Sequence, residues 1–237
     1  MDISKVTRAV RKVLPVGYCG AVIVAAGTAS RMGGIDKVMA HLGGEPMILR
    51  TVRAFQDAVA IKEIVVVTRP DLIEPITELC RTFDKVTAVV AGGSNRPESV
   101  ENGLKALSSK VKLAAIQDGA RPLITESVID RTVRAAHTYG AAAPAIPVKD
   151  TIKVENGGIV KETPDRSTLR AVQTPQVFGR ELYLRAMEYT DANALEVTDD
   201  CQMVEAVGFP IRLVEGEYTN LKITTPEDIR VAEGWLR

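Results

Sequence analysis

The sequence predicts an α/β fold, in which a Rossmann-like, mostly parallel sheet is flanked by helices and carries a protruding β-arm. Short runs of β-branched, apolar residues alternate with segments of helical periodicity, which is the pattern of parallel strands joined by helices. The runs are apolar at nearly every position, as in strands buried on both faces of a sheet. One stretch, from Pro147 to Thr174, breaks the alternation and predicts the arm.

The predicted strands of the first half are residues 21–25 (AVIVA), 64–68 (IVVVT), 86–90 (VTAVV) and 113–117 (LAAIQ). The predicted helices of that half are Met47–Ala58, Leu72–Thr82, Glu98–Leu107 and Glu126–Tyr139. In the first helix, Ile48, Val52 and Phe55 follow the i, i+4, i+7 spacing of a face that packs on a core. The last helix follows Thr125, a good N-cap residue, and stops at Gly140, a common helix terminator.

The stretch between Pro147 and Thr174 holds short extended pieces with no helix between them. These pieces are Asp150–Val154, Ile159–Thr163 and Leu169–Gln173, with a turn at residues 155–158 (ENGG). Consecutive parallel strands need a long crossover, so the pieces are predicted to form a β-arm over about residues 148–174, of the kind that contacts a second subunit. Helices are predicted again at Arg180–Tyr189, Asp199–Val207 and Pro226–Trp235.

Length and composition favour an N-terminal extension over residues 1–17 and a single domain over residues 18–237, the arm included. Hydrophobic residues make up 46% of the 237 and charged residues 25%, which is enough for a full core. No run approaches the ~18 apolar residues of a membrane span. Residues 1–17 lack the apolar segment of a secretory signal, and an organellar transit peptide is the minor alternative for them.

Charge and cysteine usage exclude further classes. Thirty basic residues balance thirty acidic ones, so no basic excess predicts a nucleic-acid partner. Cys19, Cys80 and Cys201 are widely spaced and form no CxxC pair, so neither a disulfide framework nor a zinc site is supported. This usage fits a reducing, cytoplasmic location.

A glycine-rich loop follows the first predicted strand. Residues 25–34 (AAGTASRMGG) are small enough for backbone amides to approach a triphosphate, and Arg31 and Lys37 bring positive charge to it. The loop would lie at the carboxyl end of its strand, where open α/β sheets bind ligands. Its spacing matches neither the P-loop nor the dinucleotide-binding motif. An ordinary turn with a surface Arg and Lys is the alternative.

A carboxylate follows the fourth predicted strand, in residues 117–122 (QDGARP). Asp118 would stand at the edge of the sheet, facing the glycine-rich loop, and Mg²⁺ needs few protein oxygens of this kind. Arg121 has the bidentate guanidinium that suits a substrate phosphate. The alternative is a turn in which Asp118 and Arg121 pair with each other.

Three further segments have polar residues next to predicted helices. The loop at residues 92–96 (GGSNR), with Ser99 after it, would let main-chain groups contact a base edge, or Ser94 or Asn95 would only cap the next helix. Residues 198–200 (TDD) favour a helix N-cap. Lys222 is predicted in a short strand before the last helix, where a lone lysine is usually exposed to solvent.

These residues carry a resemblance to a known family. The blocks AAGTASRM, GGSNRPES, QDGARP, PVKDTIK, TPDRSTLRAVQTPQVF, EVTDD and YTNLKITTPEDI occur in the order and spacing of the 2-C-methyl-D-erythritol 4-phosphate cytidylyltransferase family, an enzyme family of the non-mevalonate isoprenoid pathway. From about Gly20 to the C-terminus the chain resembles that family. The resemblance implies a Rossmann-like domain whose β-arm builds a homodimer.

The resemblance also implies roles for individual residues. Those that match the CTP loop are Ala25, Ala26, Gly27, Arg31 and Lys37, the last two as catalytic contacts to the triphosphate. Gly93 and Ser99 match positions around the cytosine, Asp118 a nucleotide-binding aspartate associated with Mg²⁺, and Lys222 a catalytic lysine near the α-phosphate. Positions around the sugar-alcohol phosphate match Arg121, Thr151, Arg166, Thr174 and Thr198. The arm residues Thr151 and Arg166 would enter the partner subunit's site. Ala29, Ser30 and Asp36 depart from the family's usual residues.

The implied reaction is an in-line attack by the methylerythritol phosphate oxygen on the α-phosphorus of CTP, with release of pyrophosphate. A phosphate monoester has a second pKa of about 6, so the nucleophile is already anionic and needs no general base. A ribitol 5-phosphate cytidylyltransferase is the close alternative, against which the TPDR and VTDD blocks speak. The other alternative is a nucleotide-binding module without activity, which would not need Arg31, Lys37, Asp118 and Lys222 together.

Overall fold

The computed structural model describes residues 18–27 and 38–236 and is built on one mixed sheet. The strand order is β10-β7-β11-β6-β1-β4-β5, and β12 also pairs with β7. The strands of this sheet are β1 (Cys19–Ala25), β4 (Ile61–Thr68), β5 (Val86–Ala91), β6 (Leu113–Asp118), β7 (Ala141–Pro147), β10 (Arg170–Val172), β11 (Gln176–Gly179) and β12 (Arg212–Glu215). The pairs β6-β1, β1-β4, β4-β5 and β12-β7 are parallel, and β10 and β11 run antiparallel to their neighbours. The predicted, mostly parallel sheet is confirmed.

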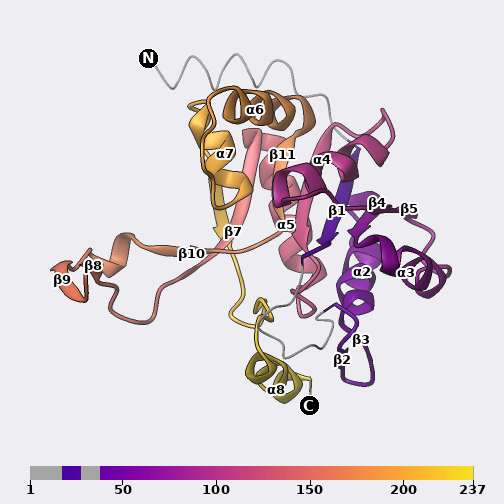
Figure 1. Cartoon of the computed structure of the whole chain (residues 1–237), viewed down its shortest axis with the longest axis horizontal. Coiled ribbons are helices and arrows are strands. Elements are labelled where there is room, and N and C mark those ends of the chain that lie inside the picture. Colours follow the sequence, from indigo (N-terminus) through magenta and orange to yellow (C-terminus); the bar gives the residue numbers. More distant parts are fainter. Residues whose placement is uncertain (1–17, 28–37, 237) are drawn as a thin grey trace.

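Helices cover both faces of the sheet and make three layers (Figure 1). On one face lie α2 (Met47–Asp57), α3 (Ile73–Leu79) and α5 (Glu126–Tyr139); on the other lie α4 (Arg96–Ala106), α6 (Arg180–Ala192) and α7 (Asp200–Ala206). The last helix, α8 (Pro226–Trp235), packs near the small ribbon of β2 (His41–Leu42) and β3 (Glu45–Pro46). The helix α5 has the predicted bounds, with Thr125 as N-cap and Gly140 in the left-handed conformation at its end.

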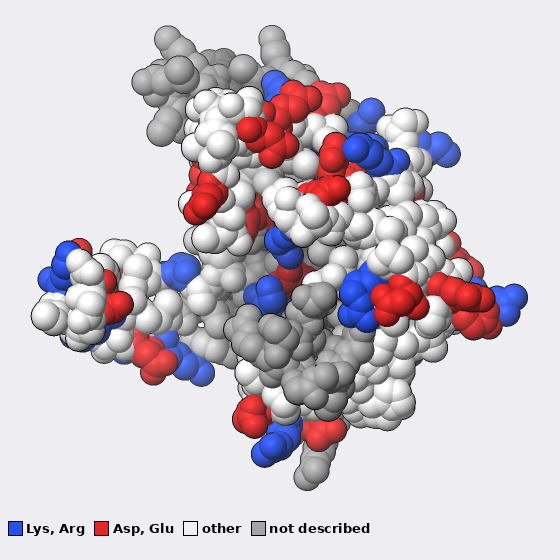
Figure 2. All heavy atoms as spheres, viewed as in Figure 1, with Lys and Arg blue, Asp and Glu red and all other residues white. Residues whose placement is uncertain are grey.

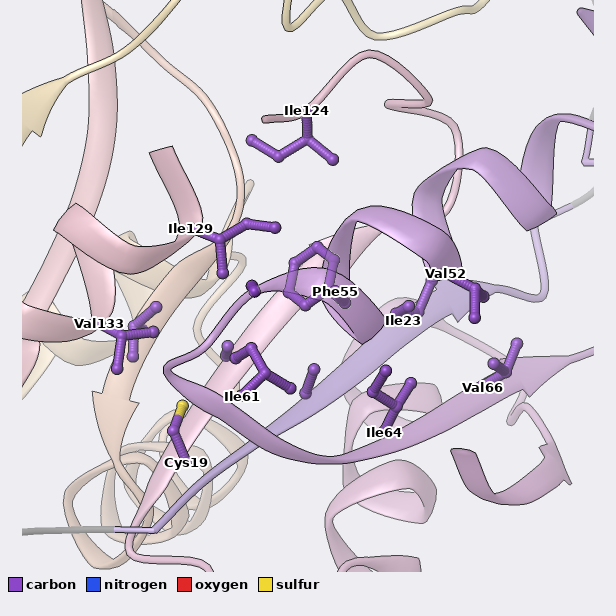
Figure 3. Close-up of a cluster of buried hydrophobic side chains, with 14 of the residues drawn as sticks. Cys19, Ile23, Val52, Phe55, Ile61, Ile64, Val66, Ile124, Ile129 and Val133 are labelled. Atoms are coloured by element: carbon purple, nitrogen blue, oxygen red, sulfur yellow. The ribbon is translucent and has the colours of Figure 1, made fainter. Parts of the chain in front are cut away.

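The alternation of side chains along β1 divides the core between these layers. Ala21 and Ile23 belong to the cluster that includes Phe55 of α2, part of which is drawn in Figure 3. Val22 points to the opposite face and belongs to the cluster that includes Leu104 of α4. A fully buried Val, Leu, Ile or Phe side chain contributes about 1.5–3 kcal/mol. The strand is therefore anchored on both faces, which holds its carboxyl end in place.

The predicted β-arm projects from the body of the molecule (Figure 1). Its tip is a hairpin of β8 (Val154–Asn156) and β9 (Ile159–Glu162), and the turn between them has Gly157 and Gly158 at φ +59° and +80°. Side chains from residue 151 to residue 163 are all exposed, including apolar Ile159. The segment of the arm predicted as extended at Asp150–Val154 is a strand only at its last residue.

The base of the arm is fixed to the domain by Tyr218. The Tyr218 hydroxyl donates to the Pro147 carbonyl at 3.0 Å, and Lys149 Nζ lies 3.7 Å from the centre of the Tyr218 ring. This cation–π contact and the hydrogen bond connect the arm to the segment that leads to α8.

One predicted element is wrong. Lys222 lies in an irregular segment rather than in a strand. A single backbone hydrogen bond, from Ile223 N to the Ala120 carbonyl at 2.8 Å, connects this segment to the loop after β6. A strand would need a series of such bonds to a neighbouring strand. The predicted helix at Leu72–Thr82 is also shorter, because a 3₁₀ turn at Pro70–Leu72 precedes α3.

None of the helices in the described part of the chain is long and apolar enough to cross a membrane.

Candidate active site

A cavity of about 400 Å³ opens at the carboxyl ends of β1 and β6. The two strands are paired from Cys19–Leu113 to Val24–Asp118, so their ends lie side by side. From β1 the chain adds β4 and β5 on one side of β1, and it then returns through α4 to β6 on the other side. Ligands of open α/β sheets bind at the point where the strand order reverses in this way. The cavity is lined by Val24, Ala25, Ala26, Gly27, Val38, Gly93, Ser94, Asn95, Arg96, Ser99, Asp118, Ala120 and Lys222.

Seven of the fourteen predicted site residues line this cavity. The cavity collects Ala25, Ala26 and Gly27 from the end of β1, Gly93 and Ser99 from the β5–α4 region, Asp118 from β6, and Lys222. Arg31 and Lys37, and with them Ala29, Ser30 and Asp36, lie outside the described residues.

The loop between β5 and α4 is shaped by two side chains of α4. Ser99 Oγ accepts from Gly93 N at 3.0 Å and donates to the Asn95 carbonyl at 2.7 Å. Glu98 accepts from both the amide and the hydroxyl of Ser94, at 2.7 and 2.6 Å. Asn95 caps the helix, as the alternative interpretation expected, and the loop still lines the cavity.

Gly92 brings this loop against the end of β1. A Cβ added at Gly92 would collide with the Cβ of Ala26. The absent side chain thus permits the two glycine-rich segments to approach each other and to present main-chain groups to one cavity.

Asp118 is the charged centre of the cavity, and its side chain is only 7% exposed. Arg96 Nη1 lies 2.8 Å from its Oδ1, while Lys222 Nζ and Arg121 Nε lie 2.9 and 3.5 Å from its Oδ2. Thr174 Oγ1 accepts from the Asp118 amide at 3.1 Å and fixes its backbone. The predicted alternative, a simple Asp118–Arg121 pair, describes only one of the three ion pairs that Asp118 forms with described residues.

These cations decide the protonation state of Asp118. Burial by itself would raise the pKa of this carboxyl, but Arg96, Lys222 and Arg121 outweigh burial and hold its pKa far below the ordinary value of 3.8. Burial also opposes the charge of Arg96, and the carboxylates of Asp200 and Asp118 more than compensate, so that the pKa of Arg96 is raised. The pocket therefore contains fixed charges of both signs near pH 7.

The low pKa of Asp118 predicts a pH-dependent contribution to stability. The charged form is favoured by the fold, so this contribution is complete above the unfolded pKa of about 4 and is lost as the pH falls toward the folded value. We expect Asp118→Asn to lower the free energy of unfolding at pH 7 by about 1–3 kcal/mol, because three cations lose a buried partner. The difference from the wild type should shrink on going from about pH 5 to pH 2.

Urea unfolding of both proteins at several pH values measures this difference. Other acids with lowered pKa values, such as Asp228 and Glu98, are present in both proteins, so the difference isolates Asp118. Parallel pH curves for the two proteins would contradict the charge assignment.

Lys222 is brought to the cavity by a set of hydrogen bonds around Asn220. Asn220 Nδ2 donates to the Thr174 carbonyl at 2.9 Å, and Arg121 Nη1 donates to the Asn220 carbonyl at 2.6 Å. The helix after this segment starts with a capping box formed by Thr225 and Asp228. The irregular segment is therefore held at both ends, and Lys222 keeps 44% of its side chain exposed toward the site.

The residues predicted around the sugar phosphate fall into two groups. Arg121 and Thr174 contact Asp118 directly. Thr198 is exposed beside the start of α7 and bonds to Gln202, and Thr151 and Arg166 are exposed on the arm. Arg166 Nη1 donates to the Lys149 carbonyl at 2.7 Å, which orders it within its own arm.

Sequence reasoning missed Arg96 and Asp200. Arg96 lines the cavity and joins Asp118 to Asp200, with 2.8 Å to each carboxylate. Its position at the start of a helix, directly after a glycine loop, is the one signal that pointed to the site. Asp200 lies in the TDD segment at residues 198–200, which is also the ordinary sequence of a helix N-cap. The sequence around Asp200 therefore gives no sign of its buried ion pair.

Figure 2 shows the charges of this face, with basic and acidic side chains meeting near its centre and both signs scattered around it. A carboxylate within a set of cations, beside two glycine-rich segments at the carboxyl ends of parallel strands, suits a ligand that carries both phosphates and a base. The fold and the site thus define an α/β nucleotide-binding protein with the charges that phosphoryl chemistry requires.

The comparison with known families is specific. A family model described as 2-C-methyl-D-erythritol 4-phosphate cytidylyltransferase matches residues 19–237. The chain belongs to this family, and it is a nucleotidyltransferase, as the sequence predicts.

Relatives and solved structures agree with the family. The chain is 44% identical over 226 residues to a 2-C-methyl-D-erythritol 4-phosphate cytidylyltransferase of Caldanaerobacter subterraneus subsp. tengcongensis, covering 92% of this chain and 98% of the relative. It is 43% identical over 219 residues to the enzyme of that name from Geobacillus kaustophilus, covering 91% and 96%. The crystal structure of 4-diphosphocytidyl-2C-methyl-D-erythritol synthase from Anaerococcus prevotii superposes with a TM-score of 0.84 at 33% identity, covering 93% of this chain and 96% of the other.

Proposed function

We propose that this pocket transfers CMP from CTP to 2-C-methyl-D-erythritol 4-phosphate and releases pyrophosphate, as a step in isoprenoid precursor biosynthesis. The observation that carries the proposal is buried Asp118, which is contacted by Arg96, Arg121 and Lys222 at the carboxyl end of β6. A cytoplasmic location fits the three free cysteines, Cys19, Cys80 and Cys201.

The nucleotide would occupy the side of the cavity formed by the two glycine-rich segments. Main-chain groups of Ala25, Ala26 and Gly27 would face the triphosphate, with the side chains of Arg31 and Lys37 as its cationic partners. The base would lie against Gly93, whose amide is oriented by Ser99.

The magnesium that the family implies fits the donor set of the cavity. Within residues 18–27 and 38–236 there is no cluster of three His, Cys, Asp or Glu side chains for a metal, so the cavity offers Asp118 alone. Mg²⁺ commonly takes one or two carboxylates and completes its shell with substrate phosphates and water. Asp118 pairs with Arg96 through Oδ1 and with Lys222 through Oδ2, so it would hold the ion once Lys222 has left Oδ2 for a phosphate oxygen. The ion would supply charge neutralisation at the phosphate oxygens when bound.

The sugar phosphate would be bound from two subunits. Arg121, Thr174 and Thr198 belong to the subunit that holds the nucleotide, and Thr151 and Arg166 would come from the arm of a second copy in a homodimer. The exposed arm supports this arrangement, because its apolar side chains, such as Ile159 at 73% exposure, lack cover in the single chain.

The chemistry assigned to the chain is positioning and charge stabilisation. The phosphate monoester is already an anion near pH 7, so a base is not needed to prepare the nucleophile. Lys222 lies where its ammonium group can give up its ion pair with Asp118 and pair with a phosphate oxygen instead, as negative charge develops on that oxygen in the transition state.

Pyrophosphate release tests the function. We expect release from CTP only when 2-C-methyl-D-erythritol 4-phosphate is present, and loss of release when EDTA removes Mg²⁺. Ribitol 5-phosphate and a sample without any sugar phosphate are the matched controls. Faster pyrophosphate release with ribitol 5-phosphate would identify that compound as the substrate instead. CTP binding without pyrophosphate release with either sugar phosphate would indicate a nucleotide-binding module without activity.

A further inference from the structure

A chain of polar side chains runs from the core beneath α6 to the cavity. Tyr183 Oη donates to Asp200 Oδ1 at 2.6 Å, and Asp200 Oδ2 accepts from Arg96 Nη2 at 2.8 Å. Arg96 Nη1 then donates to Asp118 Oδ1 at 2.8 Å. We call Tyr183, Asp200 and Arg96 the arginine clamp.

The inner end of the clamp is buried and lies outside the cavity lining. Tyr183 is fully buried and packs against Phe178, with 5.4 Å between the ring centres. Burial, followed by the charge of Asp200, raises the pKa of Tyr183 well above its ordinary value, so its hydroxyl remains a donor. Asp200 is 2% exposed and uses both of its oxygens within the clamp.

The backbone that carries Asp200 is also held. Gln176 on β11 accepts from the Cys201 amide and donates to Asp199 Oδ2, both at 2.8 Å. These two bonds fix the start of α7 to the sheet. Asp200 therefore has one defined place from which to orient Arg96.

We propose that Asp200 and Tyr183 are positioning residues for the reaction: they act through Arg96 to keep Asp118 directed at Lys222 and the phosphates. The inference rests on the proposed function. A guanidinium has five N–H donors in one plane and readily donates two of them to both oxygens of a single carboxylate. Because Nη2 of Arg96 is paired with Asp200, only Nη1 pairs with Asp118, at its Oδ1 atom. The Oδ2 atom of Asp118 therefore stays available to Lys222.

Asp200 also limits the positive charge of the pocket. Among the described residues, three cations, Arg96, Arg121 and Lys222, face the two carboxylates Asp118 and Asp200. Neutralising Asp200 would leave this set of described residues with two uncompensated positive charges in place of one. CTP, a polyanion, would then bind more tightly in the ground state, while the released Arg96 would compete with Lys222 for Asp118.

The sharpest test is a pair of variants in α6 that each remove one buried hydroxyl. Tyr183→Phe removes the donor to Asp200, and Thr190→Val removes a hydroxyl that bonds to the Ala186 and Met187 carbonyls of its own helix. We expect Tyr183→Phe to lower kcat about tenfold with KM for CTP unchanged, since it removes a hydrogen bond to a charged group. Thr190→Val should retain the wild-type kcat.

Asp200→Asn supplies a readout that does not depend on turnover. Isothermal titration with Mg²⁺ and CTP, without sugar phosphate, should give a Kd that is lower by about threefold to tenfold, while kcat falls by about 30-fold. General damage to the fold would weaken binding and turnover together, so opposite signs distinguish positioning from structural loss.

The inference is overturned if Tyr183→Phe and Thr190→Val have the same kcat, or if Asp200→Asn binds CTP more weakly than the wild type. Both results are compatible with an active wild-type enzyme, so they leave the proposed function intact. A wild type that binds CTP but releases no pyrophosphate would instead remove the proposed function and the inference with it.

Discussion

Lys222→Ala is expected to lower kcat by about 100- to 1,000-fold, the usual cost of removing one preorganised electrostatic group. Lys222 Nζ lies 2.9 Å from Asp118 Oδ2 and is the cation on the irregular segment that borders the cavity. Its side chain is 44% exposed, so its loss should change the free energy of unfolding little. The loss should appear in kcat rather than in KM for CTP, because Lys222 is assigned to charge that develops in the transition state.

Lys105→Ala is the matched control for this variant. Lys105 is an exposed helix lysine that pairs with Glu101 at 2.8 Å, away from the cavity-lining residues. It should retain the wild-type kcat. If Lys222→Ala turned over within about threefold of the wild type, the lysine would have no part in transition-state stabilisation.

Arg166→Ala is expected to lower kcat/KM for the sugar phosphate by about 100-fold, because it removes the bidentate phosphate partner that we propose for this site. Arg166 is exposed on the arm, and its hydrogen bond to the Lys149 carbonyl stays within the arm. Surface changes of this kind usually alter stability by less than about 0.5 kcal/mol. Thermal unfolding and CTP affinity should therefore match those of the wild type.

Arg170→Ala tests whether any arginine of the arm has this effect. The Arg170 guanidinium bonds to the Ser167 and Leu169 carbonyls near the base of the arm. We expect a kcat/KM close to that of the wild type. An equal loss in both variants would point to the shape of the arm rather than to a phosphate contact of Arg166.

Much of the fold could be predicted because the pattern of the first half is regular. Fully apolar runs such as residues 64–68 have few alternatives to a buried strand, and Thr125 and Gly140 mark the ends of α5. The strand β7 was not predicted, since its sequence AAAPAIP has low β-propensity and becomes a strand only through its neighbours. Lys222 was misplaced for a related reason, because polar cross-links rather than a ladder hold its segment.

The parts of the candidate site that directly follow predicted strands could be predicted from the sequence. The contacts between residues that are far apart in the sequence could not. The glycine loops and Asp118 follow predicted strands, so their common edge could be inferred. The contact of Arg96 with Asp200 joins residues 104 positions apart, and no local pattern indicates it. The positions of Thr151 and Arg166 relative to a partner depend on a second copy, which a single chain's pattern does not specify.

The most direct test of the central claim combines Lys222→Ala and Arg166→Ala in one dimer. The two variants are co-expressed with different tags, and the heterodimer is isolated through both. If each site uses Lys222 of one subunit and Arg166 of the other, one of the two sites is intact, and the heterodimer should have about half of the wild-type kcat/KM for the sugar phosphate. Each homodimeric variant serves as its own inactive control. A heterodimer as inactive as the two variants would contradict a site that is completed by the partner's arm.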